Sequence, residues 1–479
     1  MRTLDFAVIL LYFAFLVVLG YLMKRRVKSS EDAMVAGRKL NIPLVAAGRG
    51  ANLVGGATIV GGASWGYSLG LTGVWFAIGT AMLGLAFAPI AGRLKRIGDR
   101  LKFLTIGDFM EYRYGRTARI IAGLSNAIAF VGFVASQIVT TGVAMSAILN
   151  VPADQSMIIS TLIVMAYTVM GGLWAVIYTD LVQLFIIFLA VPILMLPISL
   201  SGVGGFDGLA HLPAKMLDIG GLGWGRILSM VIGTTLAGFV LQSGFAYSIA
   251  SKDDRTATHA SWVSSVVYIV PAIAAVFIGM AGFILIPGLK SANSAATAMA
   301  TGILPAGLAG LFLAAIMAAT MSTASTCAMM STMCIVKDFY RTMIRPDADE
   351  KNLLAVTRVV VLGVIVVGLV VALIFPQIIP LIIWGYNFAV GALLAALLGG
   401  LFWKRGTSQG AVASMLVGGC IHLGLQATGV LGPNLDAIFF SLPAAAIVMV
   451  AVSLLTPAPN PEVVEGVAEA GRGQQAVTA

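Results

Sequence analysis

The sequence predicts an all-α protein that crosses a lipid bilayer many times, and two observations carry this prediction. Of its 479 residues, 59% are hydrophobic and only 10% are charged, whereas a soluble protein is about one quarter charged. Apolar runs of about eighteen or more residues also recur along nearly the whole chain, each long enough to span a membrane as a helix. This composition leaves no room for a sizeable soluble domain.

Thirteen apolar segments are predicted to span the membrane, and they define a single transmembrane domain over residues 1–456. The first, 4–23, precedes the basic run KRRVK and lacks a small-residue cleavage site, so we interpret it as a retained helix and not a signal peptide. The others are 44–70, 73–92, 117–149, 155–173, 175–200, 225–250, 259–286, 305–335, 353–375, 378–402, 409–430 and 438–456. The polar tail at 457–479 is expected to be disordered.

The formal charge of +9 is compatible with an acidic partner such as nucleic acid, but the distribution of the basic residues argues against one. They cluster in short loops between apolar runs, and such loops are retained on the cytoplasmic side. With the N-terminus outside, only four basic residues lie outside the cell: Arg2, Lys215, Arg226 and Lys290. We therefore predict an external N-terminus, a cytoplasmic C-terminus and no nucleic-acid partner.

The cysteines and histidines of the sequence do not have the spacing of a metal-dependent enzyme or a transition-metal site. The cysteines Cys327, Cys334 and Cys420 lie in apolar segments without metal spacing, and we interpret them as reduced packing residues. The histidines are scattered over a loop and two unrelated spans, and an HExxH motif is absent. We expect no catalytic residues and no enzymatic activity.

The span 44–70 is rich in glycine, and we predict that it is a broken helix. The pairs Gly55–Gly56 and Gly61–Gly62 each weaken it, since glycine costs a helix about 1 kcal/mol relative to alanine. In hydrocarbon, a broken helix is tolerated only where its freed backbone groups face a cavity or a ligand. Polar Asn52 and Thr58 interrupt the same run. The alternative is close helix packing through small residues.

A later span contains the stretch TMSTASTCAMMST at 320–332, in which seven of thirteen side chains carry a hydroxyl. On a helix, Ala319, Ser322 and Thr323 share one patch, and Ser322, Ser325 and Thr326 share an overlapping one. A single hydroxyl in a membrane helix usually bonds back to its own turn. Two overlapping patches instead favour a site for a hard monovalent cation, which prefers oxygen ligands.

Asp180, in AVIYTDLVQLF, lies inside the span 175–200. An intramembrane carboxylate is costly and by default indicates an ion or proton pathway. The alternative is an interfacial aspartate that caps a helix or pairs with a basic loop residue.

Seven motifs spread over nearly the whole chain resemble those of one transporter family. They are GRKLNIP (37–43), GYSLGL (66–71), GGLWAVIYTDLVQ (171–183), IASKDD (249–254), MSTASTCAMMST (321–332), KDFYR (337–341) and LGGLFWKRGTSQGA (398–411). In combination they resemble the sodium:solute symporter family, which includes sodium/glucose, sodium/proline, sodium/sialic acid and pantothenate symporters.

This resemblance implies two inverted five-helix repeats whose first helices are broken, with the substrate near the bilayer midplane. The break of the second repeat would fall in LQSGFAYS (241–248). The implied division is a leading helix at 4–23, repeat one at 44–200, repeat two at 225–402 and two trailing helices at 409–456.

The resemblance also implies where sodium binds. The main ion would lie between the carbonyls of Ala51, Val54 and Ala319 and the hydroxyls of Ser322 and Thr323. Some family members bind a second sodium ion with an aspartate and further hydroxyls, and the matching residues here are Asp180, Ser322, Ser325 and Thr326. Two sodium ions per cycle is therefore a hypothesis.

Two departures from the family pattern concern the substrate. The proline-transporting branch carries an acidic residue where this chain has Leu53, and the sugar branch carries a Gln-Arg pair where this chain has Tyr247-Ser248. We therefore expect neither proline nor glucose as the default substrate.

Candidate substrate contacts are mostly neutral hydrogen-bonding residues on helices that face the broken segments. Trp384 has interfacial anchoring as its alternative role. Arg49 lies in the cytoplasmic half of its span and is expected to snorkel or pair there, so a small neutral or zwitterionic substrate is favoured. The candidates are Thr58, Ser64, Ser136, Gln137, Thr140, Gln242, Ser243, Tyr247, Trp384 and Asn387.

The predicted function is secondary active import of a small organic solute, coupled to one or two sodium ions. The alternative is a proton-coupled transporter of the same architecture, with Asp180 as the proton carrier. A more remote alternative is a sodium or solute sensor, but the stretch after residue 457 contains no signalling domain. We expect the chain to function as a monomer in the bilayer of the plasma (inner) membrane.

Overall fold

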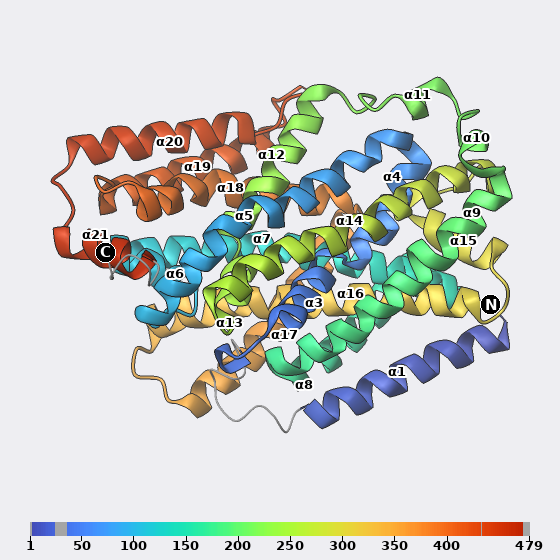
Figure 1. Cartoon of the computed structure of the whole chain (residues 1–479), viewed down its shortest axis with the longest axis horizontal. Coiled ribbons are helices and arrows are strands. Elements are labelled where there is room, and N and C mark those ends of the chain that lie inside the picture. Colours follow the sequence, from blue (N-terminus) through green and yellow to red (C-terminus); the bar gives the residue numbers. More distant parts are fainter. Residues whose placement is uncertain (1, 24–35, 433, 473–479) are drawn as a thin grey trace.

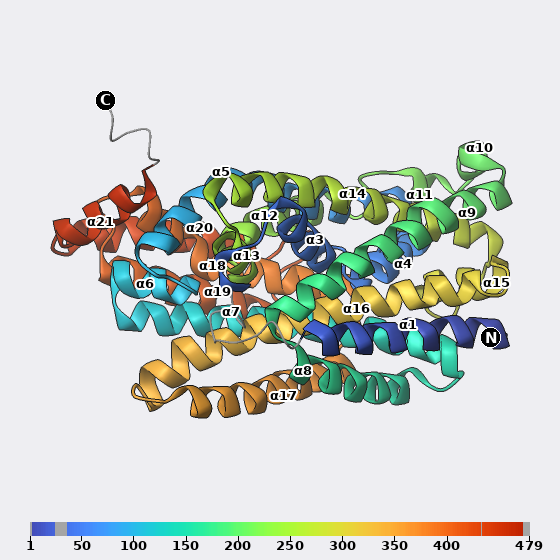
Figure 2. The same cartoon turned by 60° about the horizontal axis from the view of Figure 1, so that its bottom comes forward.

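The computed structural model describes residues 2–23, 36–432 and 434–472, which form long helices packed side by side (Figures 1 and 2). Within this part of the chain there is no β-strand, only an isolated parallel bridge between Leu40 and Ser251. Nine helices of the described part are long and apolar enough to cross a membrane, or ten if one bent pair counts as a span. The all-helical, multi-pass prediction is confirmed, whereas the number of thirteen crossings stays a prediction.

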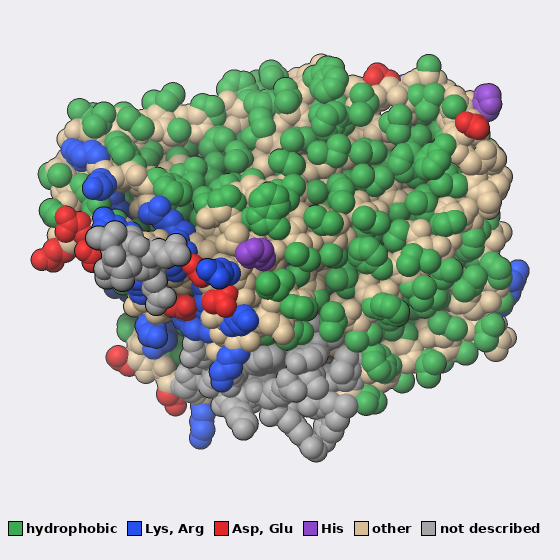
Figure 3. Space-filling view, viewed as in Figure 1, with side chains coloured by type: hydrophobic (Ala, Val, Ile, Leu, Met, Phe, Trp, Pro, Cys, Tyr) green, Lys and Arg blue, Asp and Glu red, His purple; other side chains and the backbone are tan. Residues whose placement is uncertain are grey.

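The surface has the character of a membrane protein. Hydrophobic side chains cover most of the face in Figure 3, and Lys and Arg gather at one end, around α6 (Ile106–Tyr114) and α21 (Pro461–Gly471). We call this the basic end. Large apolar side chains such as Val359 and Ile447 are exposed, as expected of residues that face lipid. The start of α1 (Thr3–Met23) lies at the opposite end (Figure 1).

The first predicted broken helix is present. Its first half, α3 (Ile42–Leu53), begins after Asn41, whose side chain accepts a hydrogen bond from the Leu44 amide at 3.2 Å. The helix ends at Val54, whose φ of −79° and ψ of 46° are not helical. The second half follows as a π-helical turn, η3 (Ala57–Gly61), and α4 (Gly62–Leu69).

The second predicted broken helix is also present. Its halves are α12 (Trp224–Val240) and α13 (Gln242–Ala250), which meet at an angle of 46°. Leu241 between them has extended backbone, with φ −77° and ψ 136°.

One element differs from the predicted spans. Segments 155–173 and 175–200 fall on α8 (Ala153–Phe188), the π-helical η5 (Leu189–Met195) and α9 (Leu196–Val203). A straight helix of 36 residues would be about 54 Å long, well beyond the hydrocarbon thickness. Figure 2 shows α8 as two arms that run in different directions, so two crossings remain compatible with it.

The remaining long helices pack in pairs. α14 lies against α5, α16 against α7, and α17 against α8, while α18 contacts α7 and α12. This pairing of counterparts is expected of two inverted repeats, although the repeats stay a prediction. The bounds are α5 Val74–Arg100, α7 Arg116–Leu149, α14 Asp254–Leu285, α16 Leu308–Met333 continued by η7 Cys334–Ile344, α17 Glu350–Ile374 and α18 Ile379–Phe402.

The other helices lie around this assembly. α19 (Ser408–Thr428) and α20 (Ile438–Leu455) pack on each other and on α18, and α1 contacts α8 and α16. Short elements at the end opposite the basic end are η4 (Gly70–Gly73), α10 (Gly205–Leu209), α11 (Ala214–Leu217), η6 (Ala292–Ser294) and α15 (Ala295–Ile303), and η2 (Ala36–Arg38) precedes α3.

The KDFYR motif lies in η7, at the basic end of the molecule, and its aspartate connects several helices. Asp338 is fully buried and accepts hydrogen bonds from the Thr105 hydroxyl at 2.8 Å and the Arg119 Nε at 3.0 Å. Arg119 also pairs with Asp108 at 2.9 Å. The motif therefore fixes the start of α6 to α7 and η7.

The tail differs from the prediction of disorder. Residues 461–471 form helix α21, which buries Val467 and Ala470 against the basic end. The Arg96 Nε donates to the Gly471 carbonyl at 3.1 Å, and Arg100 donates to the Glu469 carbonyl. Arginine side chains of α5 thus hold α21 in place by hydrogen bonds to its carbonyl groups. The polar, small-residue composition of this segment did not predict these contacts. Residues 473–479 lie outside the described residues.

Candidate functional site

The break after α3 leaves backbone carbonyls near the hydroxyl-rich helix α16. The Thr323 Oγ1 lies 3.4 Å from the carbonyl oxygens of both Ala51 and Asn52. One residue earlier, the Ser322 hydroxyl donates to the Ala319 carbonyl at 3.1 Å. The structure therefore brings four of the five residues of the predicted main sodium site, Ala51, Ala319, Ser322 and Thr323, onto two facing segments.

The fifth predicted ligand, Val54, is the fully buried residue at which α3 ends. Its amide donates to the Gly50 carbonyl at 2.8 Å, so the last helical bond closes directly before the break. The Thr58 hydroxyl donates to the Leu53 carbonyl at 3.0 Å across the break. The Leu53 carbonyl and the Thr58 hydroxyl thus add neutral oxygen atoms at the break, the ligand type that suits a monovalent cation.

Two glycines explain why the break can approach α16 so closely. A Cβ atom on Gly55 would lie 2.8 Å from the Thr323 Oγ1, and one on Gly56 would collide with the Thr320 methyl group. Both alternatives considered for the glycine-rich span therefore apply. The paired glycines break the helix, and they also permit close packing.

The predicted second sodium site is only partly assembled. Asp180 on α8 is fully buried, and its carboxylate has no hydrogen-bond partner among the described residues. Tyr247 on α13 lies within electrostatic range of Asp180 and next to Thr326, yet neither hydroxyl has a partner with good geometry in the described part of the chain. Of the other two predicted residues, Ser325 bonds to the Thr168 hydroxyl at 2.9 Å and Ser322 donates to the Ala319 carbonyl at 3.1 Å.

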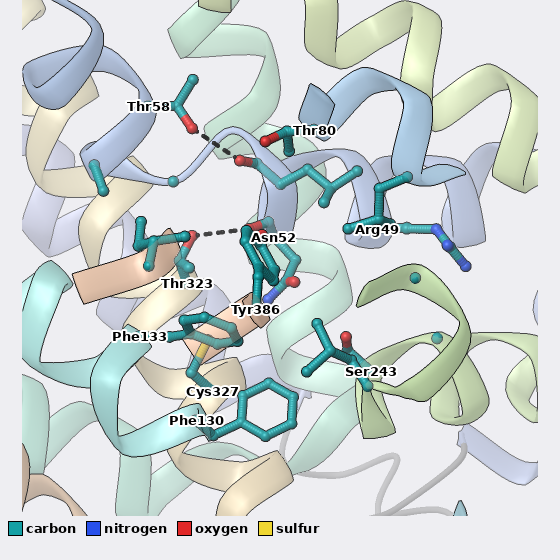
Figure 4. A pocket seen from close by; sticks show the side chains of 18 of the residues that line it. Arg49, Asn52, Thr58, Thr80, Phe130, Phe133, Ser243, Thr323, Cys327 and Tyr386 are labelled. Carbon is teal, nitrogen blue, oxygen red and sulfur yellow. Dashed lines mark hydrogen bonds between the residues drawn. The ribbon is translucent and has the colours of Figure 1, made fainter. Parts of the chain in front are cut away.

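A cavity lies beside the first break. Its walls come from both broken helices and from α5, α7, α16 and α18. Figure 4 shows Phe133 and Thr323 on one side of it, and Arg49 and Ser243 on the other. Such a site, with few polar groups among aromatic walls, suits a small organic ligand.

Four of the predicted substrate contacts line this cavity: Thr58, Gln137, Ser243 and Tyr247. Gln137 also reaches the break, since its Oε1 accepts from the Ala57 amide at 3.4 Å.

The other six predicted contacts do not line the cavity. Their side chains interact with other groups of the protein. Ser64 bonds to Asn293, Ser136 to the Ile378 carbonyl, and Thr140 to the Ser136 carbonyl. Trp384 stacks on Phe388 with ring centroids 5.5 Å apart, and Asn387 donates to Asp436 at 3.0 Å.

The sixth, Gln242, lies at the second break, and its side chain forms hydrogen bonds there. Its side chain accepts from the Ile106 amide at 2.9 Å and donates to the Leu104 carbonyl at 3.3 Å. Its backbone amide donates to the Asn126 side chain at 2.9 Å, and Asn126 in turn donates to the Val240 carbonyl at 3.1 Å. Asn126 thus satisfies the amide and the carbonyl that the break sets free, and the Gln242 side chain joins the break to the start of α6.

Sequence reasoning missed several cavity residues. Asn52 was visible as a polar residue in the glycine run, and Phe130 and Phe133 recur at helical spacing on α7. The others could not be separated from ordinary core residues by pattern alone. The lining residues absent from the predicted set include Asn52, Phe76, Thr80, Phe130, Phe133, Cys327 and Tyr386.

The expectation that Arg49 snorkels or pairs at the cytoplasmic edge is wrong. Its side chain is only 4% exposed, it lines the cavity, and its guanidinium carbon lies 4.7 Å from the centre of the Phe87 ring. A flat, weakly hydrated cation stacks well on an aromatic face, and Phe87 comes from α5, far along the sequence.

At the basic end, the two broken helices are tied together. The Leu40 amide donates to the Ala250 carbonyl at 3.0 Å, and the Lys252 amide donates to the Leu40 carbonyl at 2.8 Å. Arg38 adds an ion pair to Asp99 of α5 at 2.9 Å. These contacts join the residues directly before α3 to the residues at the end of α13.

Solved structures with the same architecture are transporters. A Na⁺-coupled sialic acid symporter in a substrate-bound, outward-open state matches with a TM-score of 0.81 at 19% identity, over 95% of this chain and 99% of that one. MHP1, a nucleobase-cation-symport-1 family transporter in a closed conformation, matches with a TM-score of 0.58 at 16% identity, over 91% and 98%. At these identities the likeness defines the fold alone.

The sequence places the chain more narrowly. The family model described as "Sodium:solute symporter family" matches residues 34–418, and the chain belongs to this family. The high-affinity proline transporter PutP of Bacillus subtilis is 27% identical over 94% of this chain and 98% of its own length. The sodium/glucose cotransporter of Vibrio parahaemolyticus is 26% identical over 95% and 90%. Membership supports sodium-coupled solute symport by a membrane transporter that is not an enzyme.

Proposed function

We propose that this protein imports a small organic solute together with one or two sodium ions by alternating access. The observation that supports this most directly is the broken α3, whose Ala51 and Asn52 carbonyls face the Thr323 hydroxyl at 3.4 Å. The main sodium ion would bind to the carbonyls of Ala51, Val54 and Ala319 and the hydroxyls of Ser322 and Thr323. As cargo, it would hold the first broken helix against α16.

The solute would bind in the neighbouring cavity, which Thr58, Gln137, Ser243 and Tyr247 line with polar groups. Because the Gln137 side chain bonds to the backbone just after the break, an ion that orders the break also orders part of the solute site. Coupling of this kind is reciprocal, so sodium and solute raise each other's affinity by the same factor.

In this proposal the protein lies in the plasma (inner) membrane, and its basic end faces the cytoplasm. The bridge between Leu40 and Ser251 would then close the cytoplasmic path, and transport would require its two hydrogen bonds and the Arg38–Asp99 ion pair to open. The protein would work as a monomer, since the cavity and the sodium ligands all come from one chain.

The sodium gradient supplies enough free energy for accumulation. Each charge that crosses about 100 mV contributes about 2.3 kcal/mol, and a roughly tenfold gradient adds about 1.4 kcal/mol. Two ions therefore provide about 7 kcal/mol, enough for a ratio of roughly 10⁵, whereas one supports roughly 10²–10³.

A thermal-shift screen of the purified chain against small organic solutes tests the proposal, with each solute measured in sodium chloride and in choline chloride. We expect at least one solute to stabilise the protein only in sodium, because ligands that bind the folded state raise its apparent stability. Thr323→Ala serves as the matched control and should lose this sodium dependence.

Stabilisation that is equal in both salts would contradict sodium coupling. Uptake into proteoliposomes that continues without sodium and stops with a protonophore would instead support the proton-coupled alternative, with Asp180 as carrier.

A further inference from the structure

Arg49 is the one charged side chain among the described residues that line the cavity. It lies in α3, four residues before the break, and is 4% exposed. Its guanidinium group stacks on Phe87, which supports the flat face of the cation but neutralises none of its charge. A buried cation at membrane depth is costly and by default indicates a functional role.

No carboxylate of the described residues forms an ion pair with Arg49, although α5 and α14 near it carry several such pairs at the basic end. Burial of a cation without a partner is strongly unfavourable. The neighbouring wall adds nothing negative, since Ser243, Gly244 and Tyr247 are neutral. Ser243 and Gly244 also lie in the first turn of the nine-residue α13, and the start of a helix favours negative charge.

We propose that the solute carries a carboxylate, which pairs with Arg49 when it binds. This inference rests on the proposed function and narrows the class of its substrate to small monocarboxylates. The aromatic side chains on the other wall, Phe130, Phe133 and Tyr386, receive the uncharged part of the molecule. A zwitterion fits less well, because the described cavity lining offers no acidic group to its ammonium.

The inference reverses the preference for a neutral or zwitterionic solute, because that preference depended on an Arg49 that faces the membrane edge. It also changes the charge balance of transport. With one sodium ion a monocarboxylate is carried without net charge, whereas two ions move one positive charge per cycle.

Matched pairs of acids and primary amides test the proposal on the purified full chain in sodium chloride: propionate and propionamide, lactate and lactamide, benzoate and benzamide. Each pair has nearly the same shape and differs in charge. We expect at least one acid, and not its amide, to raise the melting temperature and to bind by calorimetry. The proposal is overturned if no acid binds more tightly than its amide.

Arg49→Gln should weaken binding of that acid at least about 30-fold, since loss of one partner of a buried charge pair costs about 2 kcal/mol or more. Arg49→Lys should retain part of the affinity. Arg255→Gln, which changes an exposed arginine at the start of α14, is the matched control and should bind like the wild type. Equal affinity of wild type and Arg49→Gln for the acid also overturns the proposal.

If Arg49→Gln does not fold, the wild-type comparison of acid with amide decides alone. The two proposals also fail separately. If an acid binds equally well in sodium and choline salts, sodium coupling is contradicted and the carboxylate proposal still stands. Sodium-dependent binding of the amides alone would contradict the carboxylate site and leave sodium coupling.

Discussion

The two broken helices differ in what receives the backbone groups that each break sets free. At the first break, the partner of the Ala51 and Asn52 carbonyls among the described residues is a distant hydroxyl, the Thr323 Oγ1 at 3.4 Å. At the second, the side chains of Asn126 and Gln242 make bonds of 2.9–3.1 Å to the free backbone and to the start of α6.

An unwound segment in hydrocarbon needs a partner for each of its polar backbone groups. The protein supplies these partners itself at the second break, which makes that break a joint between α12, α13 and α6. At the first break Thr58 binds the Leu53 carbonyl at 3.0 Å, but the partner of the Ala51 and Asn52 carbonyls is weak, and a cation can complete the coordination of these two. Similar glycine-containing, polar interruptions in the sequence therefore serve different purposes, a joint and a binding site.

The largest expected effect is on the joint, through Gln242→Ala. The substitution leaves the Ile106 amide and the Leu104 carbonyl without their partner, and a buried unsatisfied group costs about 1–3 kcal/mol. We expect a loss of about 3 kcal/mol in unfolding free energy, measured by denaturation in detergent. Ser243→Ala, on the next residue, should stay within about 0.5 kcal/mol of the wild type.

The same pair of variants can break the comparison. If Gln242→Ala is as stable as the wild type but binds solute poorly, Gln242 is a substrate contact, as its position in the sequence predicted, and the second break is also a binding site.

The next effect concerns the packing of the first break against α16. In Gly56→Ala the new methyl group collides with the methyl group of Thr320, and overpacking of this kind costs about 1–3 kcal/mol. We expect a lower melting temperature and weaker sodium binding. Thr320→Ser removes the obstructing methyl group and keeps the hydroxyl that bonds to the Ile316 carbonyl, so the double variant should recover most of the loss. No recovery would mean that the break and α16 do not touch as described.

Thr323→Ala sharpens the comparison with a smaller effect. Loss of one oxygen ligand should weaken sodium binding about tenfold or more, equivalent to about 1.4 kcal/mol, as judged by the sodium concentration needed for thermal stabilisation. In choline chloride its stability should match the wild type within about 0.5 kcal/mol. Thr323→Ser keeps the oxygen and should behave like the wild type, and equal sodium affinity in all three proteins would exclude this hydroxyl as a ligand.

The breaks themselves were predictable from the sequence because their causes are local. Glycine pairs and the polar stretch after Leu241 weaken a helix wherever it is placed, and the hydroxyls of α16 share a face by helical spacing alone. The fate of Gln242 was not predictable, since its partners Leu104 and Ile106 are far away in sequence. The prediction for Arg49 was wrong for the same reason, because the Phe87 ring on which it stacks belongs to another helix. Helix α21 likewise depends on arginines of α5.

The last prediction asks whether the second broken helix also contributes to an ion site, beyond its joint. Tyr247 of α13 lies within electrostatic range of Asp180 and next to Thr326, and all three groups lack a hydrogen-bond partner with good geometry in the described part of the chain. If a second sodium ion binds there, Asp180→Asn should lower the Hill coefficient for sodium from about two to about one, because this coefficient cannot exceed the number of sites. Thr326→Ala should act in the same direction, whereas Ser64→Ala, outside both sites, should not. An unchanged Hill coefficient and unchanged charge per solute in Asp180→Asn would restrict sodium to the first break and leave α13 with the joint alone.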